Sequence, residues 1–177
     1  MSTAESLQVS DMKRISIIVM GVSGCGKSSM GEALAKRLGL EFIEGDALHP
    51  AENVAKMSRG IPLTDDDRWP WLATVGRALA SLPAGGVASC SALKHAYRDV
   101  LRREAGSELV FVHLKGTREL LVERMNARKG HFMPATLLDS QLAALEAPGA
   151  DENVIEVDCA EPLEPAADRV AAILAAS

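Results

Sequence analysis

The chain has 177 residues, of which 47% are hydrophobic and 24% are charged, and its formal net charge at pH 7 is −5. This length and composition favour a single soluble domain with a real core. The acidic balance argues against a general nucleic-acid binder, which needs a basic excess. No apolar run approaches the ~20 residues of a membrane span. We therefore expect neither nucleic acid nor a membrane as a partner.

The first residues are polar and mixed in charge, without the apolar centre of a signal peptide. We expect a flexible tail at 1–13 and one domain at 14–177. The three cysteines, Cys25, Cys90 and Cys159, are odd in number and scattered, which fits neither a disulfide framework nor a zinc site. This pattern indicates the reducing cytoplasm.

The first elements are a short apolar strand at 15–20 and a helix from 30 to 38, joined by Gly-Val-Ser-Gly-Cys-Gly-Lys-Ser at 21–28. These eight residues fit the phosphate-binding pattern Gly-x-x-x-x-Gly-Lys-Ser/Thr. Its glycines let the backbone turn N–H groups around phosphates. The flanking strand and helix disfavour a chance match, because the helix N-terminus adds positive charge to the anion site.

The pattern predicts binding of ATP with Mg²⁺. Lys27 is expected to reach the β- and γ-phosphates and to act in catalysis, and the Ser28 hydroxyl to ligate the metal. The residues expected to contact the nucleotide in this segment are Gly21, Val22, Ser23, Gly24, Cys25, Gly26, Lys27, Ser28 and Ser29.

The rest of the chain alternates strands and helices, which predicts a mostly parallel five-stranded sheet with helices on both faces. In chain order, the apolar patterns and caps predict a strand at 40–43, helices at 50–57 and 69–82, a strand at 85–90, a helix through 103, a strand at 109–114, helices at 117–128 and through 145, a strand at 153–157 and a helix at 165–175.

A metal-binding aspartate is missing at the end of the third strand, where the sequence reads Ser-Cys-Ser at 89–91. Either Asp46 supplies part of the second shell of the metal, or Ser28, phosphates and water hold it. The three aspartates at 65–67 allow a metal site, but capping of the following helix is the favoured interpretation.

Asp46 follows the second strand, at the edge of the sheet where α/β proteins bind ligands. A carboxylate there can orient an attacking hydroxyl or accept its proton, and it can also cap the next helix. His49 either contacts substrate or only packs and caps. Lys94 and Arg98 are four residues apart on a predicted helix, so they can converge on an anion. The alternative is a solvated basic face.

Several segments together resemble the gluconokinase family. Besides the phosphate loop they are Gly-Asp-x-x-His-Pro at 45–50, Leu-x-Asp-Asp-Asp-Arg-x-Pro-Trp-Leu at 63–72, Cys-Ser-Ala-Leu-Lys-x-x-Tyr-Arg-Asp-x-Leu-Arg at 90–102 and Arg-Lys-Gly-His-Phe at 128–132. The resemblance runs from about residue 15 to the C-terminus. It implies ATP-dependent phosphorylation of D-gluconate to 6-phospho-D-gluconate, a nucleoside-monophosphate-kinase-like fold with a mobile lid at about 118–140, and commonly a homodimer.

The resemblance also implies roles for individual side chains. Arg124 and Arg128, four residues apart in the lid, are expected to clamp phosphates and stack on adenine, which we place against residues 158–162. The expected substrate-binding residues are Asp46, His49, Arg68, Ser91, Lys94, Arg98 and His131. Without the resemblance the sequence supports only phosphoryl transfer to a small acceptor. A shikimate-like kinase, a nucleoside monophosphate kinase and a nucleotide-dependent switch then remain as alternatives.

Overall fold

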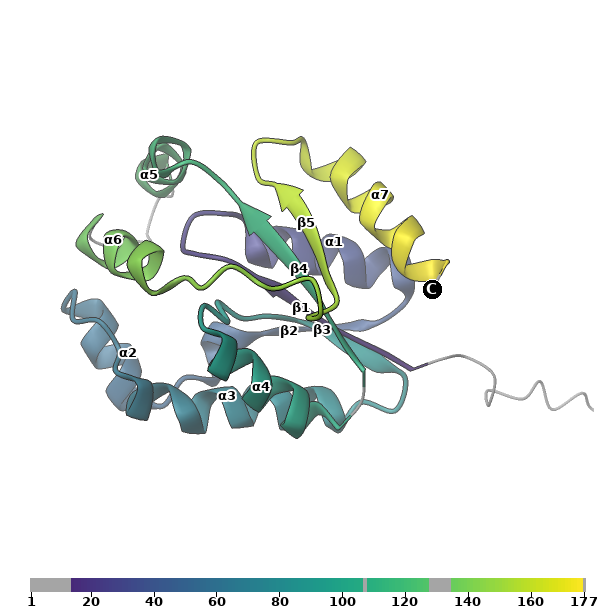
Figure 1. The fold of residues 1–177 in the computed structure, drawn as a ribbon, viewed down its shortest axis with the longest axis horizontal. Helices are drawn as coiled ribbons and strands as arrows, with labels where there is room; N and C mark the ends of the chain where they lie inside the picture. Colours follow the sequence, from purple (N-terminus) through teal and green to yellow (C-terminus); the bar gives the residue numbers. More distant parts are fainter. Residues whose placement is uncertain (1–13, 107, 128–134, 177) are drawn as a thin grey trace, which may run out of the picture.

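Five parallel strands form one sheet in the order β2-β3-β1-β4-β5 (Figure 1). The computed structural model describes residues 14–106, 108–127 and 135–176, so the expected tail at 1–13 lies outside the described residues. The strands are β1 (Ile15–Met20), β2 (Glu41–Glu44), β3 (Gly85–Ser89), β4 (Leu109–Lys115) and β5 (Val154–Asp158). The predicted five-stranded parallel sheet is confirmed.

Helices cover both faces of the sheet (Figure 1). Helices α1 (Lys27–Leu38) and α7 (Leu163–Ala175) pack together on one face, and α3 (Asp65–Ala80) and α4 (His95–Ala105) pack together on the other. Helices α2 (Ala51–Ser58), α5 (Arg118–Ala127) and α6 (Ala135–Ala144) lie towards the carboxyl ends of the strands. None of the described helices is long and apolar enough to cross a membrane.

The core forms because the central strands are apolar on both faces, as parallel sheets require. Ile17, Ile18 and Val19 of β1 are fully buried, and Phe111 of β4 and Leu34 of α1 pack in the same cluster. The packed sheet therefore fixes the carboxyl ends of its strands, and with them the starting points of the loops that follow each strand.

Helix α3 begins at Asp65, four residues earlier than predicted. Thr64 caps it: its hydroxyl accepts the Asp67 N–H at 3.2 Å, and the Asp67 carboxylate accepts the Thr64 N–H at 2.9 Å. The Lys56 ammonium also donates to Asp67, at 2.7 Å. This reciprocal capping box gives Asp67, one of the three aspartates, the predicted capping role.

A short 3₁₀ helix over Gly45–Leu48, which the sequence analysis did not predict, follows β2. Only glycine fits at position 45, because a Cβ there would lie 1.8 Å from the carbonyl oxygen of Ser89. The close approach of β2 and β3 fixes the turn that carries Asp46. A glycine before Asp46 was the available sequence signal for this contact.

His113 of β4 gives the fold a predictable acid sensitivity. Its side chain is buried, and neither ring nitrogen has a hydrogen-bond partner among the described residues. Burial, with smaller contributions from Lys115 and Arg98, lowers the pKa of His113 to about 4. Because protonation then favours the unfolded chain, stability is full above about pH 6.5 and is lost as the pH falls towards 4.

We expect the free energy of unfolding to drop by about 2 kcal/mol between pH 7 and pH 4.5 through this group. Urea denaturation at both pH values measures it. His113→Leu removes the titrating ring, so the difference between the two pH values should shrink by about the same amount. An identical difference in wild type and variant would show that other groups cause the acid sensitivity.

Candidate active site

The phosphate loop has the predicted geometry. It joins β1 to α1, and φ is +144° at Gly21, +85° at Gly24 and +92° at Gly26, which favours glycine at all three positions. The Lys27 ammonium donates to the carbonyl oxygen of Val22 at 3.0 Å, within its own loop. Lys27 is also the first residue of α1, so the loop and the positive end of the helix face the same space.

One cavity of about 470 Å³ lies beside this loop. A site of this size accommodates a small ligand such as a nucleoside. The predicted adenine position between Arg124 and residues 158–162 coincides with it. Arg128 lies outside the described residues. The lining includes Gly24, Cys25, Gly26, Ser29, Arg124, Asp158, Cys159, Ala160, Glu161 and Pro162.

A second, narrower pocket of about 60 Å³ is lined in part by Ser23 and Lys27 of the phosphate loop. It brings together residues from five parts of the chain that are far apart in sequence, because all of them follow the carboxyl ends of strands or cross that edge. Its polar lining consists of Ser23, Lys27, Asp46, His49, Arg68, Ser91, Ser140 and Gln141. Of the predicted substrate-binding residues, the structure thus places Asp46, His49, Arg68 and Ser91 together.

Asp46 and His49 form one wall of this pocket. The Asp46 side chain is 72% exposed, and one of its carboxylate oxygens lies 3.9 Å from His49 Nε2. The imidazole stacks on Trp71 with ring centroids 3.9 Å apart. Burial, opposed by Asp46 and assisted by Arg68, lowers the pKa of His49. His49 is therefore a neutral hydrogen-bonding group at pH 7.

Trp71 supports this wall of the pocket through its contacts with His49 and Gly45. Its side chain is 2% exposed and belongs to the core, and its indole N–H donates to the carbonyl oxygen of Gly45 at 2.8 Å. Trp69 is half-buried and packs edge-on against Tyr97. The turn that carries Asp46 is thus fixed by the close contact of Gly45 with the Ser89 backbone and by the hydrogen bond from the Trp71 indole.

Arg68 supplies a cation to the same pocket. Its Nη1 donates to the carbonyl oxygen of Leu63 at 2.8 Å and to the hydroxyl of Tyr97 at 3.0 Å. Tyr97 in turn donates to Asp65. These partners hold the guanidinium group in one orientation, with further N–H groups available for an anion.

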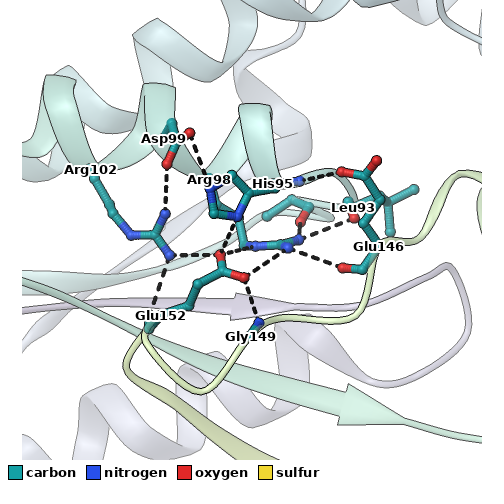
Figure 2. Close-up of polar contacts among 9 residues, drawn as sticks. Leu93, His95, Arg98, Asp99, Arg102, Glu146, Gly149 and Glu152 are labelled. Carbon is teal, nitrogen blue, oxygen red and sulfur yellow. Dashed lines mark hydrogen bonds and ion pairs between the residues drawn. The ribbon is translucent and has the colours of Figure 1, made fainter.

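The prediction that Lys94 and Arg98 converge on one anion is wrong. Lys94 is the N-cap of α4, with extended backbone angles, and its ammonium pairs with Asp65 at 3.1 Å. Arg98 is 0% exposed and points into the protein (Figure 2). Arg98 is therefore not a substrate ligand, and contact of Lys94 with substrate stays a prediction. His131 lies outside the described residues.

Arg98 instead joins two segments of backbone and one buried carboxylate (Figure 2). Its Nε donates to Glu152 at 2.7 Å, its Nη1 to the carbonyl oxygens of Ala92 and Leu93 at 2.8 and 3.1 Å, and its Nη2 to that of Glu146 at 3.0 Å. These bonds fix the loop after β3, where Ser91 and Leu93 line the narrow pocket. Arg98 thus supports the pocket without entering it.

Glu152 is the shared partner in this cluster. It also accepts from Arg102 Nη2 at 2.8 Å and from the Gly149 N–H at 2.7 Å. Burial alone would raise the pKa of Glu152, but the hydrogen bonds from Arg98, Arg102 and Gly149 outweigh it and hold the pKa well below its usual range. The ion pair is therefore fully charged at pH 7.

Glu44, at the end of β2, is a functional candidate that the sequence analysis missed. Its carboxylate accepts from Ser28 Oγ at 2.5 Å and from Ser89 Oγ at 2.6 Å. A carboxylate and a serine hydroxyl at the phosphate loop are the oxygen donors that Mg²⁺ takes beside phosphates and water. The residues present fit the metal. Glu44 was overlooked because the aspartate was sought after the third strand alone.

The fold and the phosphate loop define a P-loop kinase class. The family described as an AAA domain matches residues 17–148. A shikimate kinase from Bacteroides thetaiotaomicron shares the fold, with a TM-score of 0.66 at 17% identity, over 91% of this chain and 98% of that one.

More similar relatives include several gluconokinases. A gluconokinase from Gluconobacter oxydans is 53% identical over 144 residues, 80% of either chain, and the thermosensitive gluconokinase of Escherichia coli is 50% identical over 148 residues, 81% of this chain and 78% of that one. The crystal structure of a gluconokinase from Sinorhizobium meliloti 1021 aligns with a TM-score of 0.85 at 56% identity, over 93% and 94% of the two chains. The chain therefore belongs to the gluconokinase family.

Proposed function

We propose that this protein transfers the γ-phosphoryl group of ATP to the primary hydroxyl of D-gluconate, giving 6-phospho-D-gluconate and ADP. The main support for this proposal is that one narrow pocket is lined by Lys27 of the phosphate loop, the carboxylate of Asp46 and the guanidinium group of Arg68. The reaction needs these three charges. Lys27 serves the transferred phosphoryl group, Asp46 serves the attacking hydroxyl, and Arg68 serves the carboxylate of gluconate. Membership of the gluconokinase family supports this acceptor over shikimate, a nucleoside monophosphate or a switch.

In this mechanism Asp46 accepts a hydrogen bond from the C6 hydroxyl and takes its proton as the new oxygen–phosphorus bond forms. The bond between the γ-phosphorus and the bridging oxygen of ADP breaks in the same step. Lys27 stabilises the charge that develops on the transferred group. Ser28 would hold Mg²⁺ and Glu44 would orient it. Bound Mg²⁺ supplies neutralisation of the phosphate charge.

Arg68 is the residue of this pocket best suited to the carboxylate of gluconate. A guanidinium group fixed by Leu63 and Tyr97 presents its remaining N–H groups in a planar fork that matches a carboxylate. Neutral His49 and the Ser91 hydroxyl suit the hydroxyl groups of the polyol. This assignment replaces Arg98 in the recognition of the acid.

We expect Arg68→Met to raise the KM for gluconate by about ten- to a hundredfold, since a charge-assisted hydrogen bond contributes roughly 1.5–3 kcal/mol. The KM for ATP should remain near that of wild type. Arg77→Met, on the exposed side of the same helix, is the matched control and should change neither constant. Steady-state kinetics with both substrates, and with neutral glucitol, measures the effect. An unaltered KM for gluconate would move the carboxylate site away from Arg68.

The function itself is tested by ADP release in a coupled assay with gluconate, shikimate, AMP or no acceptor. We expect release that depends on gluconate. Equal release without an acceptor would indicate a nucleotide-dependent switch, and release with AMP or shikimate alone would indicate one of the other kinases.

Other parts of the proposal rest on the resemblance or on composition. They are the cytoplasmic location, the homodimer, the single domain over 14–177, and closure of a lid at about 118–140 in which Arg124 and Arg128 clamp the nucleotide. Each stays a prediction.

A further inference from the structure

Arg68 is a cation without a carboxylate partner. Its guanidinium group donates to the Leu63 carbonyl oxygen and to the Tyr97 hydroxyl, and it forms no ion pair with any residue that the structure describes. Asp65 lies three residues earlier on α3, at a spacing where opposite charges on a helix usually pair. Such a pair would neutralise the charge that we assign to the carboxylate of gluconate, so its absence requires a physical cause.

Two side chains from the start of α4 hold Asp65 instead. The Lys94 ammonium lies 3.1 Å from Asp65 Oδ1, and the Tyr97 hydroxyl donates to the same oxygen. Helix α4 can supply both because it packs against α3 (Figure 1). The hydrogen bond from Tyr97, followed by that from Lys94, lowers the pKa of Asp65. Asp65 is therefore a carboxylate at pH 7 whose charge is balanced by Lys94.

The Tyr97 hydroxyl separates Asp65 from Arg68. A phenol has one proton to donate and can also accept. The proton goes to Asp65, and the oxygen accepts from Arg68 Nη1 at 3.0 Å. Burial and the hydrogen bond to Asp65 raise the pKa of Tyr97, so the hydroxyl keeps its proton at pH 7. Arg68 thus contacts a neutral oxygen where a carboxylate would otherwise reach it.

The lining of the narrow pocket separates the two cations. It includes Arg68 but neither Lys94 nor Asp65. The charges of Lys94 and Asp65 largely cancel at the pocket because they lie 3.1 Å apart. The charge of Arg68 has no such partner among the described residues, and it faces the space where the acceptor is proposed to bind.

We propose that Lys94 and Tyr97 are positioning residues that keep Arg68 unpaired for the carboxylate of the acceptor. Both hold Asp65 away from Arg68, and Tyr97 also orients the guanidinium group. Without Lys94, Asp65 loses its balancing charge and turns to Arg68, and gluconate then has to displace it. The proposal rests on the proposed function for the identity of the acid, but the position of Asp65 relative to Arg68 does not depend on that identity.

The test compares Lys94→Met, Asp65→Asn and the double variant with both changes. Lys56→Met is the matched control, because Lys56 pairs with Asp67 in the first turn of the same helix at 2.7 Å. The two lysines are similarly exposed, 34% for Lys56 and 33% for Lys94, and neither lines the pocket. Steady-state kinetics gives kcat and the KM for gluconate and for ATP. Thermal unfolding checks that each variant is folded.

We expect Lys94→Met to raise the KM for gluconate by about two- to fivefold, because an exposed ion pair between Asp65 and Arg68 competes with substrate by about that factor. The KM for ATP should stay near that of wild type. Asp65→Asn alone should not raise the KM for gluconate. The double variant should return to the wild-type value, because no carboxylate remains to pair with Arg68. Lys56→Met should match wild type although it removes the same charge.

A crystal structure of Lys94→Met gives a readout that does not depend on the acceptor. We expect a carboxylate oxygen of Asp65 at ion-pair distance from the Arg68 guanidinium group in this variant. If wild type does not phosphorylate gluconate, the proposed function fails, and this structure still decides whether Lys94 keeps Asp65 away from Arg68.

Three kinetic results would overturn the proposal. An unchanged KM for gluconate in Lys94→Met would show that Lys94 does not protect Arg68. An equally raised KM in Lys94→Met and in the double variant would show that Lys94 contacts the substrate directly. A raised KM in Lys56→Met would show that any loss of positive charge near this end of α3 has the same effect. Asp65 in its original position in the crystal structure of Lys94→Met would likewise contradict the proposal.

Discussion

Asp46→Asn is expected to lower kcat with gluconate by about 10²–10⁴-fold, because general-base or orienting groups usually supply that much. The substitution keeps the shape of the side chain and removes its ability to take the proton of the hydroxyl. The turn that carries it should persist, since Gly45 against Ser89 and the Trp71 indole fix it. Steady-state kinetics gives kcat and both KM values.

Asp168→Asn is the matched control for this variant. Asp168 is a similarly exposed aspartate on α7, paired with Arg37 at 2.7 Å and away from the narrow pocket. It should leave kcat within about twofold of wild type, as surface changes usually do. A decrease of less than about threefold in Asp46→Asn would reduce Asp46 to a structural residue of the turn.

Arg98→Met is expected to lower the free energy of unfolding by about 3 kcal/mol. Removal of one partner from a buried ion pair usually costs about 3–5 kcal/mol, because the other charge remains buried. Glu152 keeps Arg102 and the Gly149 N–H, which favours the lower end of that range. Urea denaturation at pH 7 measures the change.

Two comparisons separate this role from that of a substrate ligand. Arg77→Met removes an exposed ion pair with Glu104 and should cost less than about 1 kcal/mol. The double variant Arg98→Met with Glu152→Gln should lose less stability than the sum of the single changes, since it leaves no unpaired charge at this position. Wild-type stability in Arg98→Met, together with a raised KM for gluconate, would restore the original prediction that Arg98 binds substrate.

Local sequence patterns predicted the fold because apolar runs, glycines and caps determine where most strands and helices lie. The predicted start of α3 was four residues too late, because Thr64 and Asp67 form a capping box ahead of the first apolar residues of the helix. The turn over Gly45–Leu48 was missed because its cause is a contact with Ser89, on a different strand.

The candidate site was predictable where one motif contains all the residues, as in the phosphate loop. It was less predictable where partners are distant in the chain. Spacing placed Lys94 and Arg98 on one helix face, but the partner of Arg98 is Glu152, 54 residues away. The contacts of Glu44 with Ser28 and of Gln141 with Ser23 likewise depend on the order of strands in the sheet. No spacing rule in the sequence contains that order.

The most direct measurement is phosphorus NMR of the product formed from ATP and D-gluconate by the wild-type protein. We expect a new phosphomonoester signal that is a triplet, because the phosphorus on a primary hydroxyl couples to two methylene protons. The signal should be absent without gluconate. A doublet, from phosphorylation of a secondary hydroxyl, or a signal of inorganic phosphate alone would contradict transfer to the C6 hydroxyl at Asp46.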